Sequence, residues 1–329
     1  MRKILTILLI ICSIPNLGYG QQAPIFSQYV LNEFIINPSL AGIDGMTSLS
    51  FNGRKQWLGY QYSPETYSVS LSTRILKSTT PLINKNKPGA KNFKKGTSGR
   101  VGLGTFLMKD RNGAANRTTF SATYAYHISM YNSQLSFGLS FLANQFRIDE
   151  ELAAFASPDD PLAGYLGAST YTPDAAVGAD FSTPTYHVGF SVYNLFQSPV
   201  KFGDVTANYK QLQQIRQYYF LGIYKGKIRS ITEWSYEAGM IARGNEKLQG
   251  TAEVSFRVIY IGEYWFGMSY RTTKDVIALM GFKYNRFYIG YSFDYGFNEL
   301  SQLSYGSHEI AVALKLGDST RRYRFWERY

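Results

Sequence analysis

The sequence predicts an all-β fold, a transmembrane antiparallel outer-membrane β-barrel of about 14 strands. Three observations support this prediction: a strand-like alternation of apolar and polar residues, an aromatic-rich composition, and an asymmetry of loop lengths. The chain of 329 residues contains 27 Tyr, 22 Phe and 30 Gly, and only 17% of its residues are charged. After residue 20, no apolar run approaches the ~20 residues that a transmembrane helix requires. This composition is typical of transmembrane strands with aromatic girdles.

The alternation is clearest near the C-terminal end of the chain. From Phe287 to Tyr295 every second residue is aromatic or aliphatic, and the alternate positions up to Gly296 are small or polar apart from Tyr288. A second run follows from Glu309 to Leu316. In a soluble sandwich the apolar face of such strands would form the core, whereas in a barrel it would meet lipid. This hairpin is compatible with both folds, so the choice depends on the whole chain.

The chain begins with the features of a secretory signal peptide, which we assign to residues 1–20. Arg2 and Lys3 precede a short apolar core, and small residues surround a plausible cleavage site near Gly20. Cys12 is the only cysteine, so the mature chain has no disulfide, thiol nucleophile or cysteine metal site. Loss of the two basic residues lowers the formal net charge from +11 to about +9. We expect acidic envelope partners, such as anionic lipid headgroups or protein, and no nucleic acid.

We expect the mature chain to consist of an N-terminal segment, a barrel and a short tail. Residues 21–43 lack clean alternation, residues 44–316 carry the barrel, and residues 317–329 form a basic, aromatic tail. Fourteen segments have the strand pattern, and bacterial barrels require an even number. The predicted strands are 47–53, 67–75, 101–109, 119–128, 135–141, 175–182, 186–195, 217–224, 227–240, 248–258, 264–271, 276–284, 287–296 and 310–316.

Loop lengths favour the barrel over the sandwich. If the first strand leaves the periplasm, the periplasmic connections should be short and the external ones longer. The predicted external connections 148–173 and 196–216 are long, and one periplasmic connection, 77–99, is an exception. A sandwich predicts no such two-sided asymmetry. The tight periplasmic turns are Tyr131-Asn132, Thr183-Pro184, Lys225-Gly226-Lys227, Ile261-Gly262 and Asn285-Arg286.

Short motifs near both ends of the mature chain are similar to those of a known family. They read F-S-Q-Y at 26–29, N-P-S-L-A-G at 37–42, R-K-Q-W-L-G at 54–59, G-Y-S-F-D at 290–294 and G-S-H-E-I at 306–310. In this order they resemble the signature of the PorP/SprF family, with Ser39 in place of the usual alanine. The motif residues are Phe26, Gln28, Tyr29, Asn37, Pro38, Gly42, Arg54, Gln56, Trp57, Gly59, Gly290, Tyr291, Ser292, Asp294, His308 and Glu309.

The resemblance implies an outer-membrane component of the type IX secretion system in a Gram-negative, Bacteroidetes-type cell. It implies support for the secretion or surface anchoring of a cognate large protein of the gliding-adhesin type. The implied partners are periplasmic and outer-membrane components of that system, the secreted surface protein and outer-membrane lipid. Two roles remain open for the N-terminal motifs: a tight turn that enters the first strand, or a plug in which Phe26–Leu40 threads the lumen. Trp57 and Tyr60 are expected to be girdle aromatics.

The exceptional connection 77–99 is strongly basic. From Arg74 to Arg100 there are eight Lys or Arg and no Asp or Glu. One interpretation is a solvated, disordered loop. The other is a periplasmic docking loop for an acidic partner, and the basic tail has the same two interpretations, with leaflet headgroups as a further ligand. The candidate docking residues are Lys77, Lys85, Lys87, Lys91, Lys94 and Lys95.

The sequence shows no pattern of an enzyme or of a cofactor site. His127, His187 and His308 have no partner at metal-ligand spacing, and no Walker loop, nucleophile elbow or dinucleotide fingerprint occurs. We therefore expect a protein that binds partners without catalysis, without a metal and without a cofactor. The alternative is a porin-like solute channel, in which Arg74, Glu253 and Arg257 line the pore and set its selectivity.

Overall fold

The computed structural model describes residues 26–79, 96–130, 132–149, 167–200, 213–228, 233–297 and 304–317. Within these ranges the chain forms three short 3₁₀ helices followed by fourteen strands. The elements are η1 (Tyr29–Leu31), η2 (Glu33–Ile35), η3 (Pro38–Leu40), β1 (Thr47–Lys55), β2 (Glu65–Thr79), β3 (Gly96–Asn112), β4 (Ala115–Ser129), β5 (Gln134–Ile148), β6 (Ser169–Ser182), β7 (Tyr186–Tyr193), β8 (Gln217–Lys227), β9 (Trp234–Asn245), β10 (Gly250–Tyr260), β11 (Tyr264–Arg271), β12 (Asp275–Tyr284), β13 (Phe287–Gly296) and β14 (Ser307–Leu316).

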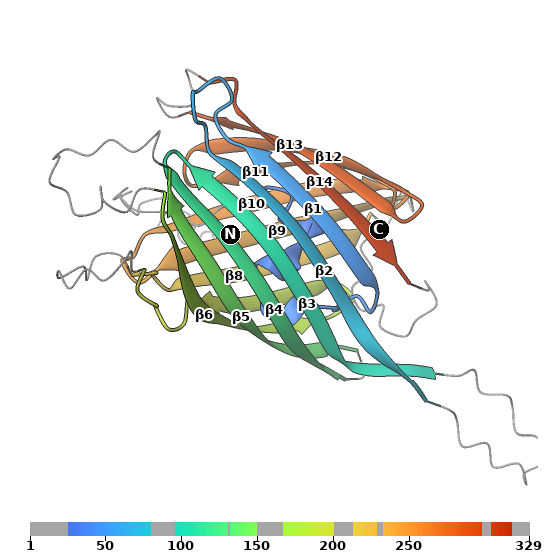
Figure 1. Ribbon diagram of the computed structural model, residues 1–329. Helices are drawn as coiled ribbons and strands as arrows, with labels where there is room; N and C mark the ends of the chain where they lie inside the picture. The colour runs from blue at the N-terminus through green and yellow to red at the C-terminus, as the bar shows by residue number, and fades with distance from the viewer. Residues whose placement is uncertain are drawn as a thin grey trace, which may run out of the picture.

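The strands close into a single antiparallel barrel, as Figure 1 shows. Each strand pairs with its neighbours in sequence, and β1 closes the ring by pairing with β14 from Thr47↔Leu316 to Lys55↔His308. Closure leaves no strand edge unpaired, which satisfies the backbone hydrogen bonds that lipid cannot satisfy. The predicted fold class and the number of strands are confirmed.

Side chains alternate across the barrel wall. On β13, Phe287 and Tyr295 are exposed on the outside, whereas Ser292 and Asp294 are buried on the inside. The same rule places large apolar side chains outward on most strands and Ser, Thr, Gly and charged side chains inward. The polar face of each strand therefore points into the lumen, as the alternation predicts.

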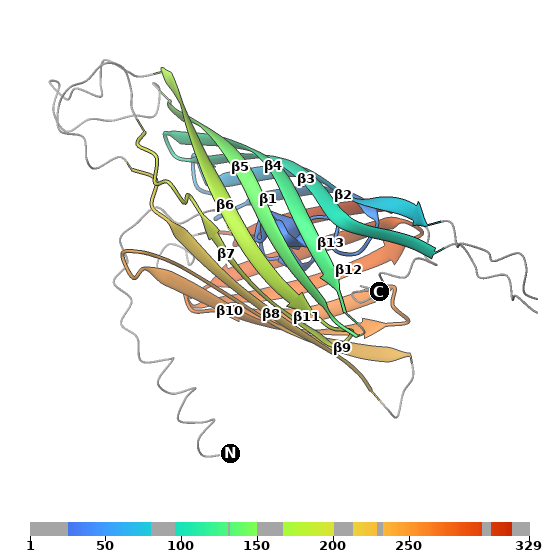
Figure 2. The ribbon, with the colours of Figure 1, turned by 90° about the horizontal axis from the view of Figure 1, so that it is seen from below.

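The N-terminal segment Phe26–Ile43, here called the lumen segment, lies inside the ring of strands (Figures 1 and 2). Its apolar side chains form the hydrophobic core with inward residues of the wall: Tyr29 and Leu40 pack with Leu221 of β8, and Phe34 packs with Phe106 of β3. In the part of the chain that the structure describes, no helix is long and apolar enough to cross a membrane.

The two ends of the barrel differ in their connections. At one end, β5 joins β6 through residues 149–168 and β7 joins β8 through residues 194–216. At the other end, β10 joins β11 through 261–263, where Ile261 and Gly262 both have positive φ, as a tight hairpin turn requires. We call these the long-loop end and the short-turn end. The two longest connections lie at the long-loop end, although 113–114 and 272–274 at that end are short and 80–95 at the other end is long.

One predicted turn is wrong. Lys225, Gly226 and Lys227 lie within β8 and pair with β9, which begins at Trp234 and not at Lys227. Gly226 was interpreted as a turn glycine, but it pairs with Tyr236, whose ring would collide with a Cβ at this position. The glycine therefore makes room for an aromatic ring within the sheet.

Other strand ends are also corrected. Leu248 lies in the turn before β10 with φ +58° instead of in the strand, and β7 ends at Tyr193 instead of at residue 195. Backbone pairing extends β2 to Thr79 and β3 back to Gly96, so Lys77 lies in a strand and not in a loop. The remaining candidate docking residues, Lys85, Lys87, Lys91, Lys94 and Lys95, lie outside the described residues, as do residues 1–20 and 318–329.

Candidate functional site

A cluster of buried charges joins the lumen segment to the barrel wall. Arg54 of β1 pairs with Asp294 of β13 (Nη2 to Oδ2, 2.6 Å) and with Glu309 of β14 (Nη1 to Oε2, 3.2 Å). The backbone N–H groups of Ser27 and Gln28 donate to the two oxygens of Glu309 at 2.7 and 2.9 Å. The hydroxyl of Ser27 donates to Asp294 Oδ2 at 2.9 Å. The two carboxylates thus hold the start of the lumen segment as well as the arginine.

A second arginine extends this cluster. Arg271 of β11 donates through Nη2 to Glu253 of β10 at 2.8 Å, and its Nη1 lies 3.4 Å from Asp294 Oδ2. None of the charged side chains is more than 4% exposed. A buried charge that loses its partner is strongly destabilising. Because the same carboxylates bind the lumen segment and the wall arginines, the position of the segment and the ion pairs of the wall depend on each other. We call Ser27, Arg54, Glu253, Arg271, Asp294 and Glu309 the latch cluster.

The next residues of the lumen segment bind the wall through neutral groups. The side-chain amide of Gln28 donates to the backbone carbonyl of Tyr291 at 2.8 Å, and the Tyr29 hydroxyl lies 3.0 Å from Ser255 Oγ on β10. Burial, and then the nearby Glu253 carboxylate, raise the pKa of the Tyr29 phenol well above its usual value. Tyr29 therefore stays a neutral hydroxyl at physiological pH.

The Asn-Pro motif forms a capped turn inside the lumen. The Asn37 side chain accepts hydrogen bonds from the N–H and the hydroxyl of Ser39 (3.0 and 2.8 Å), and Pro38 occupies the first position of η3. An Asn cap followed by proline is a favourable start for a helical turn. The Asn37 Nδ2 donates to the Ala179 carbonyl of β6 at 3.1 Å. Of the two roles left open by the sequence, the turn is present, but it lies within the lumen and not at the entrance to β1.

Glycines in the wall admit this turn. A Cβ at Gly138 of β5 would lie 2.2 Å from the Pro38 carbonyl carbon, and one at Gly178 of β6 would lie 2.0 Å from Asn37 Oδ1. Gly42, with φ +67°, would bring a Cβ to 2.6 Å from the Thr73 carbonyl oxygen of β2. No larger residue fits these positions without moving the segment away from the wall.

Two histidines bind the lumen segment from the wall. His187 of β7 lies 2.9 Å from the Asp180 carboxylate through Nδ1 and 3.5 Å from the Glu33 carboxylate through Nε2. His127 of β4 donates from Nε2 to the Ala41 carbonyl at 2.9 Å. Metal-ligand spacing alone does not reveal these contacts of the histidines, nor the roles of Glu33, Asp180 and Arg271. The available signal in the sequence is Glu33, the one charged residue of the lumen segment.

The motif residues after β1 lie at the long-loop end, outside the lumen. Trp57 N–H donates to Ser307 Oγ at 3.2 Å, and Gln56 N–H donates to the Pro64 carbonyl at 2.9 Å. Gly59 has φ +105° and lies against the Tyr305 ring. These contacts fasten the β1–β2 connection to the β13–β14 connection.

The remaining C-terminal motif residues divide between the two faces of the wall. Gly290 and Ser292 of β13 face the lumen. Tyr291 and His308 lie on the outer face, where the Tyr291 hydroxyl is 2.7 Å from His308 Nδ1. The motifs of the two chain ends thus meet in space, mostly around the latch cluster.

The residues proposed to line a channel face the lumen but bind other residues. Arg257 pairs with Glu237 of β9, and Glu253 belongs to the latch cluster. Arg74 donates to Gln134 Oε1 at 3.1 Å and to the Gly99 carbonyl at 3.0 Å. All are at most 4% exposed. Their hydrogen bonds hold the wall and the lumen segment together.

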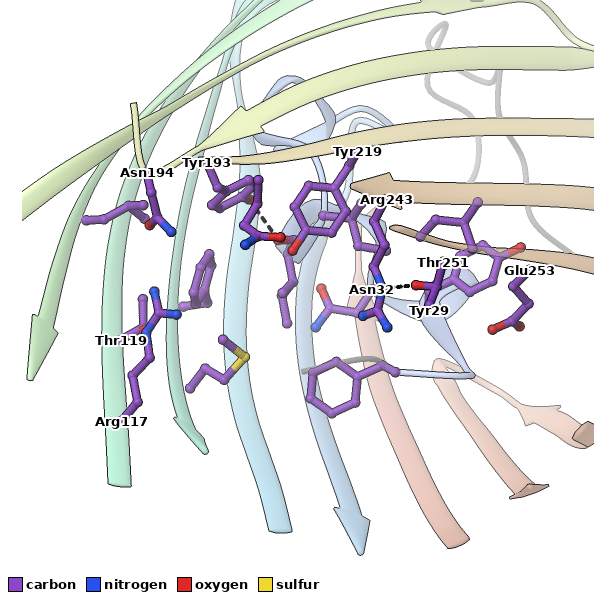
Figure 3. A pocket seen from close by; sticks show the side chains of 18 of the residues that line it. Tyr29, Asn32, Arg117, Thr119, Tyr193, Asn194, Tyr219, Arg243, Thr251 and Glu253 are labelled. Carbon is purple, nitrogen blue, oxygen red and sulfur yellow. Dashed lines mark hydrogen bonds between the residues drawn. The ribbon is translucent and has the colours of Figure 1, made fainter. Parts of the chain in front are cut away.

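A pocket opens above the lumen segment at the long-loop end (Figure 3). It encloses about 910 Å³ of space including its mouth. Its floor is the lumen segment, with Phe26, Tyr29, Asn32, Ile35 and Ile36. Its walls carry Phe106, Met108, Arg117, Thr119, Leu142, Tyr193, Asn194, Gln217, Tyr219, Ile241, Arg243, Thr251, Ala252, Glu253 and Arg271.

Metal binding has no support in the described part of the chain. Across these residues, no group of three or more His, Cys, Asp or Glu side chains is arranged to hold a metal ion. At the His187 site, Nδ1 is hydrogen-bonded to the Asp180 carboxylate at 2.9 Å, and Nε2 lies 3.5 Å from the Glu33 carboxylate.

Comparison with known families agrees with this arrangement. The model of the type IX secretion system membrane protein PorP/SprF matches residues 18–314. The chain belongs to the PorP/SprF family. As a PorP/SprF barrel it is an outer-membrane component of type IX secretion, and the resemblance drawn from the motifs is confirmed. No match was found among the curated proteins.

Solved structures similar to this PorP/SprF protein include other barrels. Omp33 of Acinetobacter baumannii is 7% identical with a TM-score of 0.42, and the match covers 84% of this chain and all of that one. BamA of Haemophilus ducreyi lacking POTRA domains 1–3 is 7% identical with a TM-score of 0.41, covering 82% and 70% of the two chains. A triple-mutant porin of Rhodopseudomonas blastica is 7% identical with a TM-score of 0.33, covering 82% and 99%.

Proposed function

We propose that this PorP/SprF barrel supports the secretion or surface anchoring of a cognate large protein, of the gliding-adhesin type, by binding it as a noncatalytic scaffold. The observation that carries the proposal is the lumen segment, which occupies the barrel and is fixed there by the latch cluster. A barrel whose interior is filled by its own chain offers surfaces to partners rather than a wide aqueous path. We propose that the long-loop end faces outward and meets the exported protein.

The alternative of a solute channel has no specific support. The three side chains assigned to a selectivity filter are buried and hydrogen-bonded. In planar bilayers, we expect the intact protein to show little steady conductance. A large, steady conductance would favour the channel.

The basic connection after β2 is the proposed contact with the periplasmic machinery. It leaves the short-turn end, where the connections between the other strands are tight. Changing Lys85, Lys87, Lys91, Lys94 and Lys95 together to Gln is expected to weaken co-purification with periplasmic components of the system. The residual interaction should also depend less on salt, because fewer charges contribute to it. Unchanged co-purification would mean that this connection is a solvated loop without a docking role.

The decisive experiment compares the surface proteome and secretome of wild-type cells with those of a deletion strain. We expect loss of one or a few large surface proteins, with other type IX cargo intact. Restoration of those proteins by the plasmid-borne gene is the control. Loss of all type IX cargo would identify a core component, and unchanged cargo would refute the proposed function.

A further inference from the structure

The pocket at the long-loop end is apolar in its centre and cationic at its sides. Phe106, Leu142 and Ile241 of the wall and Ile35 of the floor provide the apolar surface. In Figure 3, Asn194, Thr119 and Arg117 lie on one side of the pocket, and Arg243, Thr251 and Glu253 lie on the other. A bound molecule would therefore meet an arginine on either side of an apolar centre.

Three arginines and one glutamate line the pocket, and the carboxylates that pair with Arg271 are Glu253, Asp275 and Asp294. Arg117 donates to the neutral Asn144 Oδ1 at 2.9 Å and lies over the Phe146 ring, and within the described residues no carboxylate lies within ion-pair distance of it. Arg243 donates through Nε to Thr251 Oγ1. Arg117 is therefore the cation of the lining that a ligand carboxylate would neutralise.

One buried acceptor in the lining also lacks a donor. Asn194 is 4% exposed, and its Oδ1 has no hydrogen-bond partner among the described residues. The orientation of the amide is fixed, because its Nδ2 donates to the Ile215 carbonyl at 3.1 Å. A buried acceptor of this kind is stabilised by a ligand N–H.

We propose that this pocket binds a segment of the exported polypeptide in which a carboxylate adjoins an aromatic or aliphatic side chain. Arginine recognises a carboxylate through its fork of N–H groups, and a peptide N–H satisfies Asn194. A fatty acid supplies the carboxylate and the apolar chain but no N–H donor. Tyrosine and arginine, which are enriched where proteins bind proteins, line the pocket at Tyr193, Tyr219 and Arg117.

The direction of access supports an exported ligand. The lumen segment forms the floor, so the mouth opens toward the long-loop end, where the connections around Asn194 and Gln217 lie. This inference rests on the proposed function and specifies the chemistry of the exported partner at the contact.

The test uses the full mature barrel in lipid nanodiscs, which avoids detergent in the pocket. The probe is a fluorescein-labelled peptide, Gly-Ser-Phe-Asp, with a free C-terminal carboxylate, followed by fluorescence anisotropy. The matched neutral peptide is Gly-Ser-Phe-Asn with an amidated C-terminus. We expect the acidic peptide to bind at least about tenfold more tightly than the neutral one.

Variants locate the binding within the molecule. Arg117→Gln and Arg243→Gln should each weaken binding of the acidic peptide by about tenfold. Arg286→Gln removes the same charge from an exposed turn at the short-turn end and should leave binding unchanged. Where a glutamine variant fails to fold, Arg117→Lys keeps the charge without the fork and should bind with intermediate affinity.

Three outcomes would overturn the inference. These are equal binding of the two peptides, unchanged affinity in both glutamine variants, and Arg117-dependent binding of decanoate with no binding of the peptide. Surface display in cells separates this inference from the proposed function. If deletion of the gene abolishes display of the cognate protein but the Arg117→Gln, Arg243→Gln double variant restores it fully, the scaffold role stands and the pocket assignment fails.

Discussion

Two neighbouring charged sites near the long-loop end of the lumen, which share Glu253 and Arg271, use arginine in different ways. In the latch cluster, Arg54 pairs with two carboxylates of the wall, and the lumen segment binds the same carboxylates. In the pocket at the long-loop end, Arg117 donates to a neutral amide oxygen beside an apolar cavity. The charges of the latch cluster hold the chain to itself, whereas those of the pocket face space that another molecule can fill.

This difference separates structural from binding residues within one lumen. Charged groups that are buried and mutually paired cost stability when one of them is removed. A cationic group with a neutral partner costs much less to change, so its loss affects ligands more than folding. The following substitutions test this distinction in order of expected effect.

The largest effect is expected from Arg54→Met. The change leaves Glu309 buried without its cation and Asp294 with only its longer contact to Arg271, which should lower the free energy of unfolding by about 3–5 kcal/mol. Urea unfolding in lipid, followed by tryptophan fluorescence, measures this loss. The control is Lys55→Gln, on the next residue of β1, whose pair with Glu65 is largely exposed and should leave the midpoint unchanged. Similar midpoints for both variants would contradict the latch.

Gly138→Ala tests the close contact between η3 and the wall. The added methyl group meets Pro38 at 2.2 Å, which should destabilise the barrel by about 1–3 kcal/mol. The same unfolding assay applies. Gly222→Ala is the matched control on β8, because its nearest heavy atom would lie 3.7 Å away. An unaffected Gly138→Ala variant would mean that the lumen segment is not fixed against β5.

Asn37→Ala removes the cap of η3 and the hydrogen bond to Ala179. We expect a loss of about 1 kcal/mol, the usual value for an N-cap. Asn132→Ala in an exposed turn serves as the control. If the two asparagine variants lose the same stability, the cap does not contribute to holding the segment.

The smallest effect on stability is expected from Arg117→Gln. Its hydrogen bonds go to a neutral oxygen, so the free energy of unfolding should change by about 1 kcal/mol or less. The same variant should lose peptide binding, which makes it the counterpart of Arg54→Met. A stability loss as large as that of Arg54→Met would show that Arg117 is structural and that the two sites use arginine alike.

The sequence by itself determined the wall of the barrel. Period-two alternation is a local property, because successive side chains of a strand point to opposite faces. The alternation at 287–296 therefore predicted which side chains face the lumen, and loop lengths predicted the asymmetry of the ends. Sequence pattern alone does not distinguish a glycine that forms a turn from one that makes room for a side chain. Gly226 fits a turn by its sequence, but it lies within the sheet and makes room for Tyr236.

Only the tertiary structure decided what the lumen contains. Ser27 binds Glu309 across a separation of 282 residues, and Glu33 approaches His187 on a strand far along the chain. Alternation places these polar groups inside but carries no information about which of them meet, because that depends on closure of the ring and on the path of the lumen segment. Strand faces follow from local backbone geometry, whereas the latch cluster and the pocket exist only once β1 has paired with β14.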